Sequence, residues 1–311
     1  MNFKLGKFDK AIELGKEAMA KSNAIEKSEL NKIIGESYFN LGKYAEAIPY
    51  LNQYKGKKGK WNNTDYYQLG YAYYKQNDFE NAIAQFNKIV GGNDSVAQNA
   101  YYHLGESYLK TNKKLQALNA FKNASEMSFD TQIQEDAALN YAKVSYDIGN
   151  SYQAVPDVLN AFIQKYPKSP AKLEIENLLI DSYITSKNYQ GALDLLEKNK
   201  SSNKVAYQKV TFYRGLELYT DGNYSEALKL FVKSINEPRD AKFLARATFW
   251  KAETEYVLDN FSAALITYKQ FLNLAEAKNT TEFKNSNYNI AYTYFKLKEY
   301  DQAGDYFQKQ I

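Results

Sequence analysis

One short phrase recurs nine times along this 311-residue chain, and no other feature restricts its fold as strongly. The phrase is seven residues long, as at 41–47, and is generally rich in Gly, Asn or Asp before it closes on an alanine. Successive closing alanines lie 36, 35, 35, 37, 38, 35, 37 and 39 residues apart, which is the regularity of a repeat protein. They are Ala11, Ala47, Ala82, Ala117, Ala154, Ala192, Ala227, Ala264 and Ala303.

Two further positions keep a fixed distance from the alanine. In the eight copies after the first, a small residue stands twelve positions before the alanine, except where Ile180 occupies this position, and an apolar residue follows the alanine by four. Offsets of three and four place side chains on one helix face, whereas Gly and Asn permit a tight turn with positive φ. Each copy therefore predicts a helix, a turn and a helix, with small residues where the helices approach closely. The small residues are Gly35, Gly70, Gly105, Ala142, Gly215, Ala252 and Ala291. The apolar residues are Leu51, Phe86, Phe121, Val158, Leu196, Phe231, Tyr268 and Phe307.

In most copies an aromatic or apolar residue also follows the small residue by three, as Tyr73 follows Gly70. The period and this pattern of small, aromatic, alanine and apolar positions resemble the tetratricopeptide repeat. The resemblance extends from residue 3 to residue 311 and implies an all-α fold, an α-solenoid of antiparallel helical hairpins in a right-handed superhelix. We expect about seventeen helices and essentially no strand. The expected single array has a half-repeat at 3–22 and full repeats at 28–58, 63–92, 98–128, 135–168, 173–200, 208–237, 245–276 and 284–311.

Composition excludes several kinds of chemistry. The chain has no cysteine, which excludes disulfides, thiolate metal sites and cysteine nucleophiles. Its single histidine, His103, is expected to be a polar groove or helix-surface residue, since the sequence shows no partners for a catalytic base or metal ligand. No phosphate-binding glycine loop is present, and no apolar run is long enough for a membrane span. We therefore predict no catalytic residue, metal, cofactor or membrane span.

Charge gives no indication of a nucleic-acid partner. The chain has 40 basic and 36 acidic residues, a net charge of +4 that is shared evenly by its two halves. Proteins that bind nucleic acids usually concentrate basic charge on one face. The one basic run, at 55–60, is interpreted as a solvated loop, although its lysines are also suited to contact phosphate.

The resemblance also implies where a ligand binds. In the family, the first helix of each hairpin lines a concave groove that receives peptides, at positions three before, one after and four after the small residue. Tyrosine, which occurs 29 times here, suits such a surface. The alternative for each ring is packing against a neighbouring repeat. The predicted groove residues are Tyr67, Tyr71, Tyr74, Tyr102, Glu106, Phe212, Phe249, Tyr256, Tyr288 and Tyr292.

Two classes of function remain open. The first is a non-catalytic scaffold that binds a partner protein or peptide in the aromatic groove; the second is an enzyme, with a site in the groove or in missing flanking regions. The clamp by which one subclass binds acidic chaperone tails is not matched, because Glu36 replaces its asparagine. The chain begins in a turn and ends in a second helix, so we expect a segment of a longer array whose uncapped ends offer sites for self-association. The run at 162–170 resembles linkers of bacterial cell-envelope members, which favours the periplasm or cell envelope over the cytoplasm.

Overall fold

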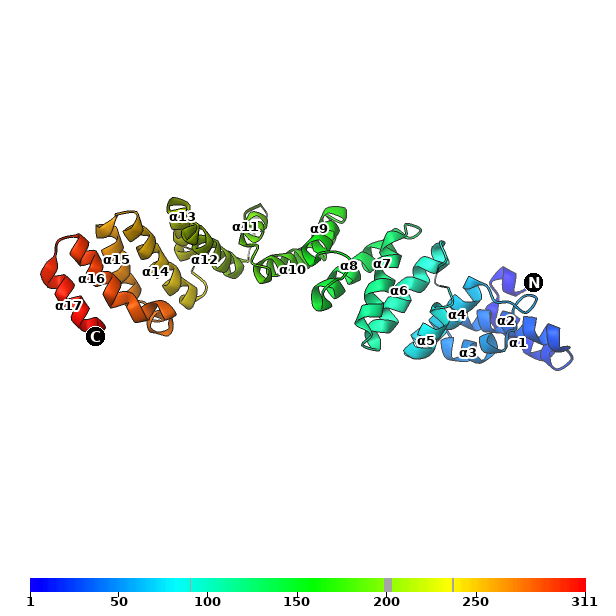
Figure 1. Cartoon of the computed structure of the whole chain (residues 1–311). Coiled ribbons are helices and arrows are strands. Elements are labelled where there is room, and N and C mark those ends of the chain that lie inside the picture. The colour runs from blue at the N-terminus through cyan, green and yellow to red at the C-terminus, as the bar shows by residue number, and fades with distance from the viewer. Residues whose placement is uncertain (90, 199–202, 237) are drawn as a thin grey trace. The chain divides into compact units, whose positions relative to one another are not determined.

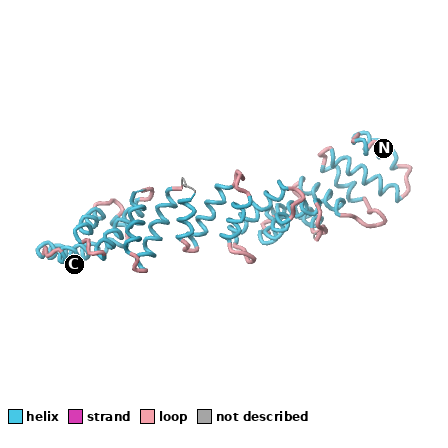
Figure 2. The backbone as a smooth tube through the Cα atoms, turned by 90° about the horizontal axis from the view of Figure 1, so that it is seen from above, coloured by secondary structure: helices cyan, strands magenta, loops and turns pink. Residues whose placement is uncertain are grey.

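The computed structural model of the chain describes residues 1–89, 91–198, 203–236 and 238–311 (Figure 1). These residues form seventeen α-helices and no strand, apart from one isolated β-bridge between Lys57 and Lys60 (Figure 2). The predicted all-α fold of helical hairpins is therefore confirmed. The chain divides into two compact units, Met1–Glu176 and Asn177–Ile311, and the boundary falls inside helix α10 (Lys172–Thr185). The single array and its repeat boundaries stay a prediction, and the repeat ends expected at 200 and 237 lie outside the described residues.

The first unit begins with a short 3-10 helix and continues as pairs of helices joined by tight turns. Each first helix packs against the second helix of its own hairpin, and neighbouring first helices such as α4 and α6 also touch. The elements are η1 (Phe3–Leu5), α1 (Phe8–Met19), α2 (Ala24–Asn40), α3 (Tyr44–Gln53), α4 (Asn63–Lys75), α5 (Phe79–Phe86), α6 (Ser95–Lys110), α7 (Lys114–Glu126), α8 (Thr131–Ile148) and α9 (Val155–Lys165).

The second unit is built in the same way, and its first helices α12 and α14 are in contact. Two short 3-10 helices, η2 and η3, connect its last two hairpins. The elements are α11 (Tyr189–Lys198), α12 (Lys204–Thr220), α13 (Tyr224–Asn236), α14 (Ala241–Val257), α15 (Phe261–Leu272), η2 (Ala277–Asn279), η3 (Thr281–Asn285), α16 (Ser286–Lys296) and α17 (Tyr300–Gln310).

The small residue of a first helix faces the apolar residue sixteen positions later on the second helix. A Cβ atom placed on Gly70 would lie 2.8 Å from Phe86, and one on Gly215 would lie 2.8 Å from Phe231. Real Cβ atoms do not approach other atoms this closely, so the small residue is required for the helices to meet at this distance. The predicted role of the small residues is confirmed at these positions.

Each of the nine recurring phrases places its second residue in the left-handed region, with φ between 58° and 79°. In this position the chain reverses direction between two helices. Asn77 and Asn112 suit it, because asparagine tolerates left-handed backbone better than most residues. Lys187 and Lys298 adopt the same conformation without that advantage. The turn shape is therefore maintained by the packing of the hairpin even where the residue disfavours it.

Ala154 departs from the pattern of the closing alanines. It is exposed, whereas the other eight closing alanines are buried. In most of the hairpins the second helix begins three residues before the alanine, but here α9 begins only after Ala154. Asn150, which would cap an earlier start, bonds instead to the Tyr141 hydroxyl at 2.8 Å and to Ser145 Oγ at 2.9 Å, and Pro156 lies in the first turn of α9. The expected contact at Ala154 is therefore wrong.

A buried glutamine joins each of two first helices to the start of the next hairpin. Gln98 Nε2 donates to the carbonyls of Ala124, Met127 and Asp130, and its Oε1 accepts from the Asp130 backbone N–H at 2.7 Å. Gln208 makes the same pair of bonds with Asp240, at 3.1 and 2.8 Å. The two glutamines stand seven residues before Gly105 and Gly215, so they occupy one repeat position. We call Gln98 and Gln208 the glutamine staples.

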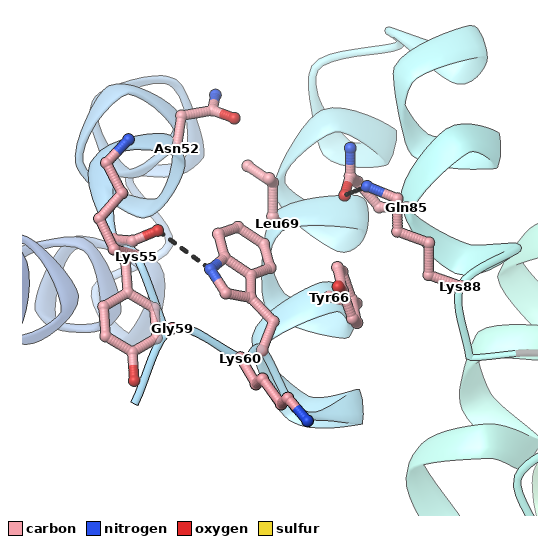
Figure 3. Close-up of a pocket in the computed structure, with 10 residues that line it drawn as sticks. Asn52, Lys55, Gly59, Lys60, Tyr66, Leu69, Gln85 and Lys88 are labelled. Carbon is pink, nitrogen blue, oxygen red and sulfur yellow. Dashed lines mark hydrogen bonds between the residues drawn. The ribbon is translucent and has the colours of Figure 1, made fainter. Parts of the chain in front are cut away.

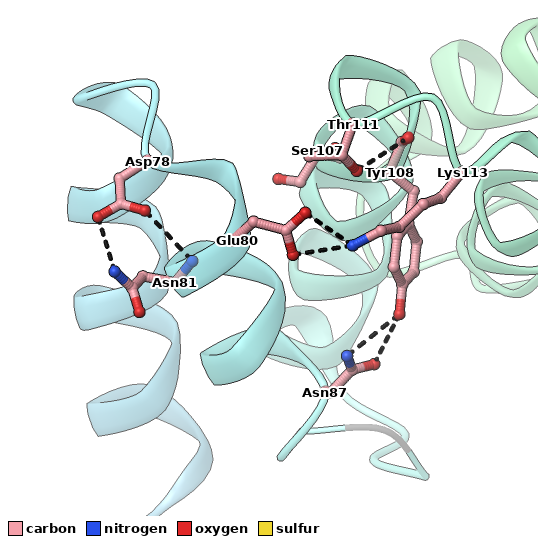
Figure 4. A network of polar contacts seen from close by, with 8 residues as sticks. All are labelled: Asp78, Glu80, Asn81, Asn87, Ser107, Tyr108, Thr111 and Lys113. Carbon is pink, nitrogen blue, oxygen red and sulfur yellow. Dashed lines mark hydrogen bonds and ion pairs between the residues drawn. The ribbon is translucent and has the colours of Figure 1, made fainter.

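Tyrosines three residues after the small residue bond to the preceding hairpin. The Tyr108 hydroxyl contacts the side chain of Asn87, which follows α5, and Lys113 pairs with Glu80 of α5 at 2.7 Å (Figure 4). Tyr73 in α4 likewise accepts from Asn52 Nδ2 at 2.8 Å. These hydroxyls satisfy a polar group at the margin of the core and tie adjacent hairpins together.

Candidate functional site

Two consecutive first helices of the first unit assemble an aromatic cluster. Helix α4 contributes Tyr67, Tyr71 and Tyr74, and α6 contributes Tyr102 with His103. The rings of Tyr67 and Tyr71 stack with centroids 5.7 Å apart, and the His103 ring lies 5.0 Å from both Tyr71 and Tyr74. Tyr102 lies 5.2 Å from His103. The structure therefore brings together the four predicted tyrosines of this unit; with His103 and Glu106 we call them the α4–α6 aromatic cluster.

Glu106 provides the negative charge of the cluster. Its Oε2 lies 2.8 Å from Nδ1 of His103, one turn earlier on α6. Burial and the nearby Glu106 carboxylate raise the pKa of Tyr74, and the same two causes raise the pKa of Tyr102 to about 12. Both phenols therefore keep their protons at neutral pH and can donate hydrogen bonds to a ligand.

The rings of the cluster are only half-buried, but they also pack on the core of the unit. Tyr67 lies 6.0 Å from Phe86, the residue that faces Gly70 across the hairpin, and Tyr71 lies 5.7 Å from Tyr44 of α3. Packing against neighbouring helices, the alternative for each ring, thus accounts for part of each tyrosine's surface. The remaining part is open to a partner, and its use as a binding site stays a prediction.

Two of the predicted groove residues are core residues instead. Phe212 has no exposed surface and lies 5.4 Å from Phe243, with the Arg246 guanidinium 4.6 Å from its ring centre. Phe249 is buried against Tyr268 and Phe271. Both stand three residues before the small residue, a position that points toward the second helix of the hairpin. Phenylalanine carries no polar group that would keep that position near water, so the groove prediction is wrong for Phe212 and Phe249.

The other predicted residues of the second unit line a cavity of about 340 Å³. Tyr256 comes from α14, and Tyr288 and Tyr292 come from α16 with exposed fractions of 46% and 40%. Glu253 of α14, which occupies the groove position one residue after the small residue, also lines it, together with Tyr268 of α15 and Asn289 of α16, which the groove positions did not include. Glu253 stands one residue after Ala252, as Glu106 does after Gly105, so its repeat position was the available signal. We call this cavity the Glu253 pocket.

The basic run at 55–60 is exposed, and two of its lysines line a larger cavity of about 620 Å³ (Figure 3). Lys55 and Lys60 border it from the loop, and Lys88 borders it from the end of the next hairpin. Trp61 lies in the wall and donates its indole N–H to the carbonyl of Tyr54 at 3.0 Å. This cavity could not be predicted from the basic run alone, because it also depends on Lys88, 28 residues further along the chain.

Burial raises the pKa of two carboxyls, Glu36 in the first unit and Glu253 in the second. Among the described residues no group of three or more His, Asp or Glu side chains is placed to hold a metal ion. The described helices also include none that is long and apolar enough to cross a membrane. Lys32 of α2 pairs with Asp65 of α4 at 2.6 Å.

Comparison with protein families finds matches in three stretches of the chain. Residues 33–55 and 285–311 match a tetratricopeptide-repeat model. Residues 54–124 match the model of subunit 3 of the anaphase-promoting complex, or cyclosome. The matched stretches include α4 and α6 of the aromatic cluster and α16 of the Glu253 pocket. No curated protein matches the chain.

Several solved structures are similar to the chain at low sequence identity. The TPR2AB domain of yeast Sti1 in complex with pHSP90 has a TM-score of 0.45 and 17% identity, over 86% of this chain and 97% of that one. The C-terminal part of a TPR repeat-containing protein from Cytophaga hutchinsonii has a TM-score of 0.39 and 15% identity, over 92% and 96%. A tetratricopeptide repeat protein from Parabacteroides merdae has a TM-score of 0.33 and 17% identity, over 77% and 98%. None of these matches supports the cell-envelope location suggested by the linker at 162–170.

Proposed function

This chain is a tetratricopeptide-repeat protein, and from that premise we propose that it is a scaffold that holds a partner polypeptide on the tyrosine-rich face of its first helices. Proteins with these repeats bind protein or peptide partners and are typically non-catalytic, which favours this function over an enzyme site in the groove. The proposed surface consists of the α4–α6 aromatic cluster in the first unit and the Glu253 pocket in the second.

The observation that carries the proposal is a repeated one. In both units, tyrosines from successive first helices surround a single carboxylate, Glu106 or Glu253, at the position one residue after the small residue. Helix packing alone does not require a carboxylate among rings, because burying its charge has a cost in free energy. Tyrosine, by contrast, contributes large contact area at protein interfaces with little loss of rotamer entropy. A surface that binds a polypeptide accounts for both features.

The test is a comparative capture of partners from lysate of the source cells. The parent chain, a face variant with Tyr71→Ala and Tyr292→Ala, and a control variant with Tyr152→Ala and Tyr300→Ala are immobilised in equal amounts. The control tyrosines are exposed and lie outside the proposed surface. We expect a protein that mass spectrometry identifies with the parent and the control but not with the face variant. Equal recovery of every captured protein by all three would contradict the proposal.

Association between copies of the chain is the competing use of the same surface. Phe295, three residues after Tyr292 on α16, adds exposed aromatic area to this surface. Sedimentation velocity of the parent and the face variant separates the two uses. A parent that remains a monomer while it captures its partner supports hetero-association, whereas a dimer lost in the face variant would assign the surface to a second copy.

A further inference from the structure

Glu253 is a half-buried carboxylate with no cation beside it. Its Oε1 accepts from the Tyr268 hydroxyl at 2.5 Å and also from Asn289 Nδ2. Within the described part of the chain, no basic side chain pairs with Glu253 and no group donates to its Oε2. Lys251, two residues earlier on α14, is already paired with Glu255 at 2.5 Å and bonded to Thr267. The pocket therefore holds an uncompensated negative charge, and in agreement with this, burial raises the pKa of Glu253.

The walls around this carboxylate are also suited to a cation. Tyr256, Tyr288 and Tyr292 line the pocket, and the rings of Tyr288 and Tyr292 lie 4.7 Å apart at an angle of 54°. The faces of aromatic rings carry partial negative charge and attract ammonium and guanidinium groups, as in the aromatic cages that bind methylated lysine. Because Tyr288 and Tyr292 are partly exposed, a side chain from solution can pass alongside their rings into the pocket.

The bonding of the carboxylate favours one kind of cation. A guanidinium binds best when it reaches both oxygens of a carboxylate, whereas an ammonium needs only one. Oε1 of Glu253 already accepts two hydrogen bonds, which leaves Oε2 as the single free acceptor. We propose that the Glu253 pocket binds the ammonium group of a lysine side chain of the partner polypeptide, with Glu253 Oε2 as its counter-ion and Tyr256, Tyr288 and Tyr292 around its methylene stem.

The equivalent carboxylate of the first unit shows the alternative arrangement. Glu106 is already paired with His103, and the Tyr71 and Tyr74 rings lie within 5.0 Å of that imidazole. An internal group thus occupies the place that remains open beside Glu253. The lysine site is accordingly assigned to the second unit alone. This inference rests on the proposed function, since it specifies the chemistry of the partner, but it is tested without that partner.

The experiment measures binding of a short neutral-flanked peptide, acetyl-Gly-Lys-Gly-amide, to the full chain by saturation-transfer and chemical-shift NMR at neutral pH. Counterparts in which norleucine or arginine replaces lysine serve as probes of charge and shape. We expect the lysine peptide to bind, the norleucine peptide to bind at least about tenfold more weakly because it lacks the charge, and the arginine peptide to fall between them. Norleucine or arginine binding as tightly as lysine would overturn the inference.

Three variants identify the site. Glu253→Gln keeps an acceptor for Tyr268 and Asn289 but removes the charge, and it should weaken lysine-peptide binding about tenfold. Tyr292→Ala alters a partly exposed ring and should weaken binding about fivefold through loss of its contact with the lysine side chain. Glu299→Gln removes the same charge from an exposed position of the same unit and should leave binding unchanged. Equal weakening by Glu253→Gln and Glu299→Gln would show that the peptide is attracted non-specifically by negative charge, and it would contradict a lysine site at Glu253.

The outcome also separates this inference from the proposed function. If the lysine peptide does not bind, while capture of the natural partner still depends on Tyr71 and Tyr292, the scaffold function stands and the lysine site is wrong. If the lysine peptide binds through Glu253 but no partner depends on the aromatic face, the pocket chemistry stands and the scaffold surface is wrong. Circular dichroism of each variant confirms that the helices remain folded.

Discussion

A Cβ atom placed on Gly105 would lie 2.7 Å from Cε1 of Phe121, on the second helix of the same hairpin. Alanine at this position gains about 1 kcal/mol of helix propensity over glycine, but it must displace the fully buried Phe121 ring. We expect Gly105→Ala to lower the free energy of unfolding by about 1–3 kcal/mol, as for other overpacked cores, measured by urea denaturation.

Gly304 provides the matched control for this prediction. It lies within α17, is exposed, and would bring an added Cβ within 4 Å of no other atom of the described neighbourhood. Gly304→Ala should therefore stabilise the chain by up to about 1 kcal/mol. Equal shifts of the denaturation midpoint in the two variants would contradict the close approach of α6 and α7.

The glutamine staples predict a second loss of stability. Gln98→Leu keeps most of the side-chain volume but leaves the Asp130 N–H and the carbonyls of Ala124, Met127 and Asp130 without this partner. The expected cost is about 2 kcal/mol, the effect of leaving buried polar groups unsatisfied. The exposed Gln116 on α7 is the control, and Gln116→Leu should change the free energy of unfolding by less than about 0.5 kcal/mol. A similar loss in the free energy of unfolding for Gln98→Leu and Gln116→Leu would contradict a stabilising role of the glutamine staple.

Lys298 predicts a gain in stability. Its φ of 64° is disfavoured for a residue with a side chain, and the turn between α16 and α17 requires it. Glycine adopts this conformation freely, so Lys298→Gly should stabilise the last hairpin by about 0.5–1 kcal/mol, which thermal melting would detect. Lys296→Gly, two residues earlier at the end of α16, should destabilise it by a similar amount because that residue is helical. A loss in both variants would be inconsistent with strain at Lys298.

The proposed binding face predicts a loss of affinity with retention of the fold. Tyr67 contacts the core residue Phe86, so the better pair to change is Tyr71 and Tyr74. Tyr71→Ala with Tyr74→Ala should weaken binding of the captured partner by about 2–4 kcal/mol, the range of interface hot spots, as measured by calorimetry. Tyr152→Ala, in the same unit but away from the face, should not change affinity. Unchanged affinity in the double variant would exclude the α4–α6 aromatic cluster as a binding site.

Glu253 predicts a pH dependence of stability with an unusual sign for a carboxyl. Because burial raises its pKa in the folded chain above the ordinary 4.5, the folded chain takes up this proton at a higher pH than the unfolded chain. Protonation of Glu253 therefore stabilises the fold as pH falls toward 4.5. The melting temperature of the parent minus that of Glu253→Gln should increase as the pH is lowered from 7 to 4.5. A difference that falls over this range would contradict the burial of an uncompensated charge.

Glu282 serves as the control of opposite sign. Burial is the largest single influence on this carboxyl and would raise its pKa. The hydrogen bond from Arg246 at 2.8 Å, the Arg246 charge and the bonds from the backbone and Thr281 together outweigh burial and lower the pKa of Glu282. The stability contributed by this pair is present above pH 4.5 and is lost as pH falls through the lowered pKa. As pH falls below 4.5, the melting temperature of the parent should therefore decrease relative to that of Glu282→Gln.

The repeat could be predicted from sequence because its cause is local. Offsets of three, four and sixteen residues determine which side chains meet within a hairpin, and the pair of Gly70 and Phe86 follows from that spacing. Ala154 was misplaced because Pro156 and the bonds of Asn150 delay the start of α9, which the alanine spacing does not reveal.

The candidate site was less predictable, because it depends on contacts between hairpins. Phe212 and Tyr67 occupy the same repeat position, yet one is fully buried and the other half-exposed, a difference set by neighbours such as Phe243. The Glu253 pocket depends on Asn289, 36 residues further along the chain. The glutamine staples could not be predicted from the apolar repeat pattern, because Gln98 and Gln208 are polar and lie outside it.

The two glutamine staples make the junctions after α7 and α13 interchangeable in their hydrogen bonding. Gln98 and Asp130 are 32 residues apart, as are Gln208 and Asp240, and both aspartates cap the following helix through the second and third residues beyond them. A recombination event that joins Asp130 directly to Ala241, or that duplicates the segment between the two aspartates, would recreate the same bonds at the new junction. Gene rearrangement can thus lengthen or shorten such a chain by whole blocks of hairpins without the need to evolve a new joint.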